Sequence, residues 1–173
     1  VGIDVSEHQG AIDWAKVKAD GIKFAIIRVG YGSDYEAQDD EYFFQNVAGA
    51  RANGIAIGVY IYSYATKATG TSGSAQSEAN HVIRLLNKAG LTPASLALPV
   101  YLDMEDDKQG ALNSSTLGDI AETFCNAIMA KGYKVGIYSN PNWWNNKLTS
   151  SKFNNSNWSR WIADWNNGTA PSM

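Results

Sequence analysis

The chain has 173 residues, of which 45% are hydrophobic and 18% are charged, a balance that is typical of a soluble globular domain with a substantial core. Its net charge of -3 at pH 7 argues against a nucleic-acid partner, and no apolar run approaches the length that spans a bilayer. The single cysteine, Cys125, excludes an internal disulfide bond and a multi-cysteine metal site. We expect a monomer without a nucleic-acid or membrane partner.

One pattern recurs along the chain: a helical segment ends at a glycine, and a run of β-branched or aromatic residues follows. In chain order it predicts strands near residues 2–5, 23–29, 56–63, 98–104, 134–139 and 160–164. It predicts helices over residues 13–20, 40–53, 76–89 and 116–131, the last with Ser115 or Thr116 as its N-cap. The glycines expected in left-handed conformation after helices are Gly21, Gly54, Gly90 and Gly132.

The predicted strands are nearly continuous apolar runs, as in parallel sheets whose strands are covered on both faces. Strands that alternate with helices indicate an α/β architecture with right-handed crossovers. No nucleotide-binding glycine motif follows any strand, and the Gly/Ser/Thr-rich segment at 66–77 is expected to be a flexible loop. Polar clusters fall at the carboxyl ends of strands, where a (β/α) barrel carries its active site. We therefore predict one domain over residues 1–173 that forms an irregular, abbreviated TIM-like barrel, because a complete barrel needs about 250 residues.

The segment "PVYLDMEDDKQG" at 99–110 ends a buried strand in four carboxylates. Residues i and i+2 of a strand share a face, so Asp103 and Glu105 lie on one side with backbone origins roughly 6.6 Å apart. Met104 points to the other side, toward the covering helices, whereas Asp106 and Asp107 are expected to be solvated loop charges. A pair of carboxylates at a strand end is the arrangement that glycosidases use.

Two further acids, Asp4 and Asp164, follow other predicted strands. Four carboxylates at one barrel mouth would raise one another's pKa, which predicts that Glu105 keeps a proton near neutral pH. Structural alternatives stay open: Asp4 caps a turn, Asp164 pairs with Arg160 or Arg28, or the acids hold Mg²⁺ or Ca²⁺. No metal site is predicted, however, because the histidines lack a third ligand at metal-binding spacing and the acids lack an EF-hand pattern.

Six segments in chain order resemble glycoside hydrolase family 25, the N-acetylmuramidases (lysozymes) found in bacterial autolysins and phage endolysins. They are "GIDVSEHQGAIDW", "GIKFAIIRVGYG", "DEYFFQNVAGARANGIAIGVYIYSYA", "PVYLDMED", "GYKVGIYSN" and "WIADW". The resemblance extends over nearly the whole chain and implies an irregular (β/α) barrel.

The resemblance implies that Glu105 is the general acid and that Asp103 is its partner, assisting either water or the 2-acetamido group of the substrate. Asp4 and Asp164 fall on the two supporting acidic positions of the family. The aromatic residues expected to contact sugar are Tyr62, Tyr138 and Trp165.

The implied substrate is peptidoglycan glycan strands, cut at the β-1,4 bond between N-acetylmuramic acid and N-acetylglucosamine without a cofactor, outside the cell or in its wall. Family members continue into a closing segment with a Trp-Gln pair and a late Asp, whereas this sequence ends at "NNGTAPSM", so we expect a truncated C-terminal end. Two alternatives remain, a non-catalytic glycan-binding module on the same scaffold and a glycosidase for another glycan such as chitin. The residues leave retaining or inverting stereochemistry open.

Overall fold

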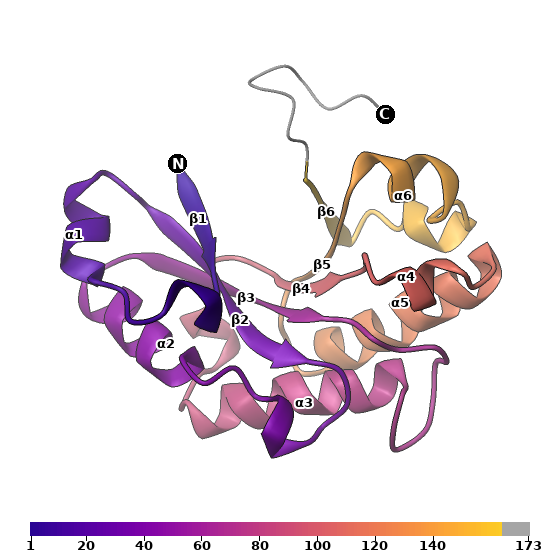
Figure 1. Ribbon diagram of the computed structural model, residues 1–173, viewed down its shortest axis with the longest axis horizontal. Helices are drawn as coiled ribbons and strands as arrows, with labels where there is room; N and C mark the ends of the chain where they lie inside the picture. Colours follow the sequence, from indigo (N-terminus) through magenta and orange to yellow (C-terminus); the bar gives the residue numbers. More distant parts are fainter. Residues whose placement is uncertain (164–173) are drawn as a thin grey trace.

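The protein is described by a computed structural model, in which residues 1–163 are placed. Its strands are β1 (Gly2–Val5), β2 (Phe24–Tyr31), β3 (Ala56–Tyr62), β4 (Val100–Asp103), β5 (Val135–Ser139) and β6 (Trp158–Ile162). They form one parallel sheet in the order β1-β2-β3-β4-β5-β6, which curls into a half-barrel (Figure 1). Each strand therefore pairs with the next one along the chain, as in a barrel, whereas a doubly wound open sheet reverses its order at a switch point. The predicted abbreviated barrel is confirmed.

The helices are α1 (Trp14–Ala19), α2 (Phe43–Ala52), α3 (Ala75–Lys88), α4 (Asp107–Gly110), α5 (Ser114–Ala130) and α6 (Pro141–Asn146). Short 3-10 turns lie at Glu7–Gln9, Glu36–Gln38, Pro93–Ser95 and Ser151–Asn154. Helices α2, α3 and α5 cover one side of the sheet (Figure 1). None of the helices between residues 1 and 163 is long and apolar enough to cross a membrane.

The predicted strands and helices are all present, whereas the short helices α4 and α6 were not predicted. The four glycines expected after helices have φ values of 85°, 65°, 69° and 90°, which confirms their left-handed role. The predicted N-cap of α5 is wrong. This helix begins earlier than expected, and the side chain of Asn113 caps it by accepting from the backbone N–H of Thr116 at 2.8 Å.

Strand β3 shows how the two faces of the sheet differ. Ile57, Val59 and Ile61 are at most 1% exposed on the helix-covered face, where they join the main hydrophobic core. Tyr60 and Tyr62 alternate with them and stay partly exposed on the other face. The expectation that both faces are covered is therefore wrong for β3, because its aromatic residues concealed an alternating pattern. The uncovered face provides the candidate site.

Candidate active site

The strand register places a row of functional side chains across the concave face of the sheet. Tyr62 on β3 is the register partner of Asp103 on β4, Asp103 is that of Tyr138 on β5, and Tyr138 is that of Trp161 on β6. Register partners in a parallel sheet point to the same face, so the four side chains stand side by side. Parallel pairing of the strands therefore gathers residues that are 99 positions apart in the sequence.

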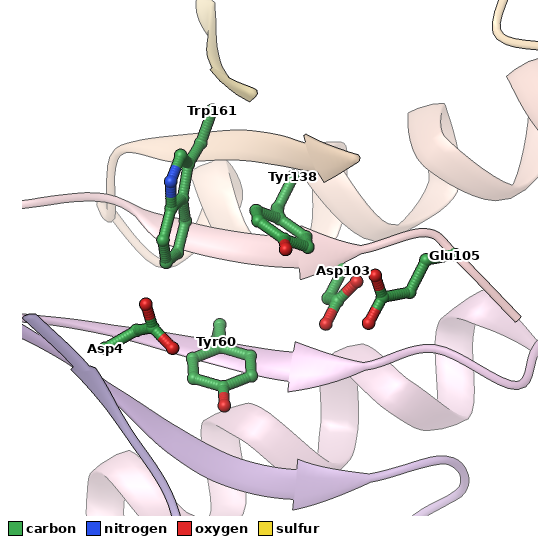
Figure 2. A pocket seen from close by; sticks show the side chains of 6 residues that line it. All are labelled: Asp4, Tyr60, Asp103, Glu105, Tyr138 and Trp161. Atoms are coloured by element: carbon green, nitrogen blue, oxygen red, sulfur yellow. The ribbon is translucent and has the colours of Figure 1, made fainter. Parts of the chain in front are cut away.

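A pocket of about 110 Å³ opens on this face. Its lining residues are Asp4, Tyr60, Asp103, Glu105, Tyr138 and Trp161 (Figure 2). The structure thus brings together three of the four predicted acids and one of the predicted sugar-contacting aromatics. Of the other three predicted site residues, Asp164 and Trp165 lie outside the described residues, and Tyr62 lines a second pocket.

Glu105 lies beyond the end of β4, and the backbone around Met104 returns its side chain to the pocket. The N–H of Met104 donates to the carbonyl of Tyr138 at 2.9 Å, and the hydroxyl of Ser139 donates to the carbonyl of Met104 at 2.6 Å. Met104 itself is fully buried, as the alternation of side chains predicted. These bonds extend the strand pairing by one residue, so that Asp103 and Glu105 face the same side.

The carboxyl groups of Asp103 and Glu105 face each other in the pocket (Figure 2). Two carboxyl groups that face each other repel when both are ionised, so this arrangement favours a proton shared between them. Burial raises the pKa of Asp103, the negative charges of Glu105 and Asp4 raise it further, and burial also raises the pKa of Glu105. The sequence predicted the retained proton on Glu105. Asp103 is only 4% exposed and Glu105 is half-buried, so burial favours the proton on Asp103 in the free protein.

The other two acids of this segment have different surroundings. Asp106 was expected in a solvated loop, but it is the N-cap of α4, accepting from the N–H of Lys108 at 3.1 Å and of Gln109 at 3.4 Å. A carboxylate at this position satisfies free N–H groups and interacts favourably with the helix dipole. Asp107 is exposed, as predicted.

An aromatic wall closes one side of the pocket. The ring of Trp161 makes edge-to-face contacts with Tyr138, Tyr101 and Tyr60, with centroids 4.7, 5.3 and 6.4 Å apart. Gly136 leaves space for this wall, since a Cβ there would lie 2.6 Å from Cε1 of Tyr101. Tyr60 and Trp161 were missed as site residues, although Tyr60 precedes Tyr62 by two positions and so shares its face.

A second pocket of about 280 Å³ lies beside the first and is lined by Glu7, His8, Arg28, Tyr31, Tyr62 and Tyr64. Tyr62 thus lines this pocket and not the acid pocket, although it is the register partner of Asp103. Burial raises the pKa of Tyr62, and the negative charge of Glu105 raises it further. Arg28 pairs with Glu7 at 2.9 Å and with Asp40 at 2.8 Å. The guanidinium proposed as a partner for Asp164 therefore already has two carboxylate partners.

Among residues 1–163, no group of three or more His, Cys, Asp or Glu side chains is arranged to hold a metal ion. His81 is buried, and its ring nitrogens lie 3.0 Å from the carbonyl oxygen of Gly32 and 2.7 Å from Oδ1 of Asp39. These two contacts hold the ring of His81 in place. Cys125 is buried in α5.

The family model "Glycosyl hydrolases family 25" matches residues 3–173. Lysozyme M1 from Streptomyces globisporus is 31% identical over 170 residues, which cover 95% of this chain and 54% of that protein. A bacterial lysozyme structure from Streptomyces coelicolor superposes with a TM-score of 0.80 and 28% identity, covering 99% of this chain and 76% of that one. The modular autolysin LytC from Streptococcus pneumoniae, in complex with a synthetic peptidoglycan ligand, gives a TM-score of 0.74 and 25% identity over 87% of this chain and 35% of LytC. The chain thus spans about half of Lysozyme M1 and about a third of LytC.

Proposed function

Because this chain belongs to glycosyl hydrolases family 25, we propose that it hydrolyses peptidoglycan at the β-1,4 bond between N-acetylmuramic acid and N-acetylglucosamine. The observation that carries the proposal is the facing pair of carboxyl groups of Asp103 and Glu105 in a pocket with an aromatic wall. A raised pKa supplies an acid near neutral pH, and aromatic faces suit sugar rings. Since the relatives include an autolysin, the proposed place of action is the cell wall.

In the proposed reaction, Glu105 is the general acid because it is the more exposed member of the pair. The shared proton moves to Glu105 and then to the glycosidic oxygen as the bond to the anomeric carbon breaks. Asp103 is left ionised and accepts the N–H of the 2-acetamido group, whose oxygen attacks the anomeric carbon. Water then opens this intermediate, and Glu105 takes the proton from the water.

The closeness of the two carboxyl groups supports participation of the acetamido group. Inversion uses carboxyl groups about 6.5–9.5 Å apart, and a carboxylate nucleophile needs about 5–5.5 Å, whereas the carboxyl groups of Asp103 and Glu105 face each other directly in the pocket (Figure 2). Attack by the acetamido oxygen followed by water gives net retention. Proton NMR of the first product formed should therefore show the β-anomer, and an initial α-anomer would contradict the scheme.

Asp4 and Asp164 are proposed to act through their negative charges, which change the electrostatic field at Asp103 and Glu105. Replacing Asp4 by Asn should lower kcat/KM by a modest factor, about tenfold, because Asp4 does not transfer the proton. Removing its negative charge also favours the ionised form of Asp103, whose pKa then falls. The basic limb of the pH–rate profile should shift to lower pH. A profile of kcat/KM from pH 4 to 9 measures this shift. An unchanged basic limb would show that the charge of Asp4 has no effect on the pKa of Asp103.

Trp161 is proposed to bind a sugar ring through its exposed face. Replacing Trp161 by Ala should raise KM for a soluble glycan about tenfold, the equivalent of about 1.4 kcal/mol, while kcat changes less. Trp161→Phe should keep most of the affinity, because a flat ring remains. Steady-state kinetics of both variants test this role. A loss confined to kcat would show that the ring acts on the acid pair instead.

Purified cell walls distinguish the proposed activity from the alternatives. The protein should release new reducing ends, and mass spectrometry should show that they belong to N-acetylmuramic acid. Binding to walls without new reducing ends would favour a glycan-binding module. Reducing ends on N-acetylglucosamine, or faster cleavage of chitin, would favour another glycosidase.

A further inference from the structure

A buried carboxylate, Glu78 on α3, contacts the segment that follows β3. Only 1% of the surface of Glu78 is exposed to solvent. Oε1 accepts from the hydroxyl of Ser63 at 2.8 Å and from the N–H of Ala65 at 3.0 Å, and Oε2 accepts from the N–H of Tyr64 at 3.3 Å. No basic side chain of residues 1–163 forms an ion pair with it. Glu78 is thus held by donors of one short turn.

The hydrogen bonds around Glu78 have a fixed direction. Nε2 of Gln109 donates to the carbonyl of Ala65 at 2.9 Å, and a carbonyl only accepts, so the amide nitrogen must lie at this end. The same nitrogen lies 2.8 Å from Oγ of Ser63 and donates to it. Ser63 therefore uses its own hydrogen to donate to Glu78. The chain of donors runs from Gln109 through Ser63 to Glu78.

These bonds join the segments that follow two adjacent strands. Ser63–Ala65 comes directly after β3 and Tyr62, which lines the second pocket. Gln109 is on α4, whose N-cap is the residue next to Glu105. The N–H of Ser63 also donates to the carbonyl of Asp103 at 2.9 Å. A movement of Glu78 would therefore also move the segments that carry Tyr62 and Glu105.

Burial raises the pKa of Glu78, whereas the hydrogen bonds from Ser63, Tyr64 and Ala65 stabilise its ionised form and oppose the rise. A buried carboxylate without a cation costs free energy, and an apolar or amide side chain is the less costly way to pack a helix. Anchoring α3 alone does not require an acid here. The acid instead supplies acceptors to two backbone N–H groups and one hydroxyl of an irregular turn, which an apolar side chain leaves unpaired.

We propose that Glu78 is a positioning residue, which holds the turn Ser63–Ala65 and, through Ser63 and Gln109, helix α4, so that Glu105 keeps its place in the pocket. This inference rests on the proposed function, in which Glu105 protonates the leaving oxygen. Glu78 does not touch the pocket itself, since it lines neither cavity.

The variant Glu78→Gln keeps the shape of the side chain but turns one acceptor into a donor that faces N–H groups. Its kcat on a soluble peptidoglycan oligosaccharide should fall about tenfold or more, since a small misplacement of reacting groups is costly, whereas KM should change less than about threefold. Tyr133→Phe is the matched control, because it removes a buried hydrogen bond of 3.2 Å to the carbonyl of Leu91 at the amino end of β5. This control should lose stability and keep its kcat.

Gln109→Met tests the same network from its other end and serves if Glu78→Gln does not fold. It should lower kcat to a similar degree. The kcat of the double variant should be no lower than that of either single variant, because both substitutions disrupt the same hydrogen-bond network. Fully additive losses would overturn the proposal. An unchanged kcat in Glu78→Gln, or an equal loss in Tyr133→Phe, would also overturn it.

Hydrogen exchange separates this inference from the proposed function. The amides of Tyr64 and Ala65 should exchange faster in Glu78→Gln than in the wild type, and Tyr133→Phe should leave them unchanged. This readout needs no substrate, so it stands even if the wild type releases no reducing ends. Equal protection in Glu78→Gln and the wild type would exclude the positioning role.

Discussion

Replacing Glu105 by Gln is expected to lower kcat/KM on peptidoglycan by about a thousandfold or more, near the upper range of general acid catalysis. Gln has nearly the same shape but carries no proton that it can transfer to the glycosidic oxygen. Its amide can donate a hydrogen bond to Asp103, so the pocket should keep its form. Release of reducing ends, measured beside the unfolding temperature, tests both statements.

The chain offers a matched control in the same acidic segment. Asp107 is exposed and does not line the pocket, so Asp107→Asn should change the rate less than about twofold, as surface substitutions away from a site usually do. A synthetic glycan with a nitrophenolate leaving group sharpens the test, because this group departs without protonation. Glu105→Gln should be far less impaired on it. A Glu105→Gln enzyme with most of its activity on peptidoglycan would refute the assignment.

Replacing Asp103 by Asn should lower kcat/KM nearly as much, by about a hundredfold or more, and should at the same time stabilise the fold. The amide cannot supply the negative charge that the acetamido N–H requires in the proposed reaction. The substitution also removes, however, a buried ionisable group that lies beside the negative charges of Glu105 and Asp4. Removing such a group typically adds about 1 kcal/mol to the free energy of unfolding.

This gain should depend on pH in a defined direction. Burial raises the pKa of Asp103 in the folded protein above the value of 3.8 that applies in the unfolded chain. Between these values the unfolded wild type loses a proton that the folded form keeps, so wild-type stability falls as the pH rises above about 4. The Asp103→Asn variant has no such loss, and its advantage should therefore grow from pH 4 to pH 8. Urea unfolding at several pH values measures it, and an advantage that shrinks with pH would contradict a raised pKa for Asp103.

The sequence was informative wherever a local signal determined a local structure. Glycines at helix ends located the boundaries between helices and strands, because only glycine adopts the left-handed conformation without a steric penalty. The i, i+2 rule brought Asp103 and Glu105 to one face, although β4 ends at Asp103 and a bond to β5 is needed to extend it. Parallel pairing of the strands then places Asp103 in one row with Tyr62, Tyr138 and Trp161.

The sequence could not predict how deeply each side chain is buried or which side chains contact one another across strands. Tyr60 and Trp161 were counted among apolar residues, and only the curled sheet shows that they line a pocket. The proton was expected on Glu105 because the family resemblance makes it the general acid, and the sequence does not show that Asp103 is the more deeply buried of the two. The N-cap of α5 was missed because three adjacent polar residues, Asn113, Ser114 and Ser115, are all capable caps.

The strictly sequential order of the sheet has a consequence for how the chain folds. Each new strand pairs with the strand synthesised just before it, so the sheet can grow in one direction as the chain emerges. The acid pocket behaves differently, since Asp4 comes from β1 and Trp161 from β6. A nascent chain released as far as the residues just after β4 would already carry three acids of the pocket without its aromatic wall. The pocket is therefore completed only when β6, the last strand of the sheet, brings Trp161 into place.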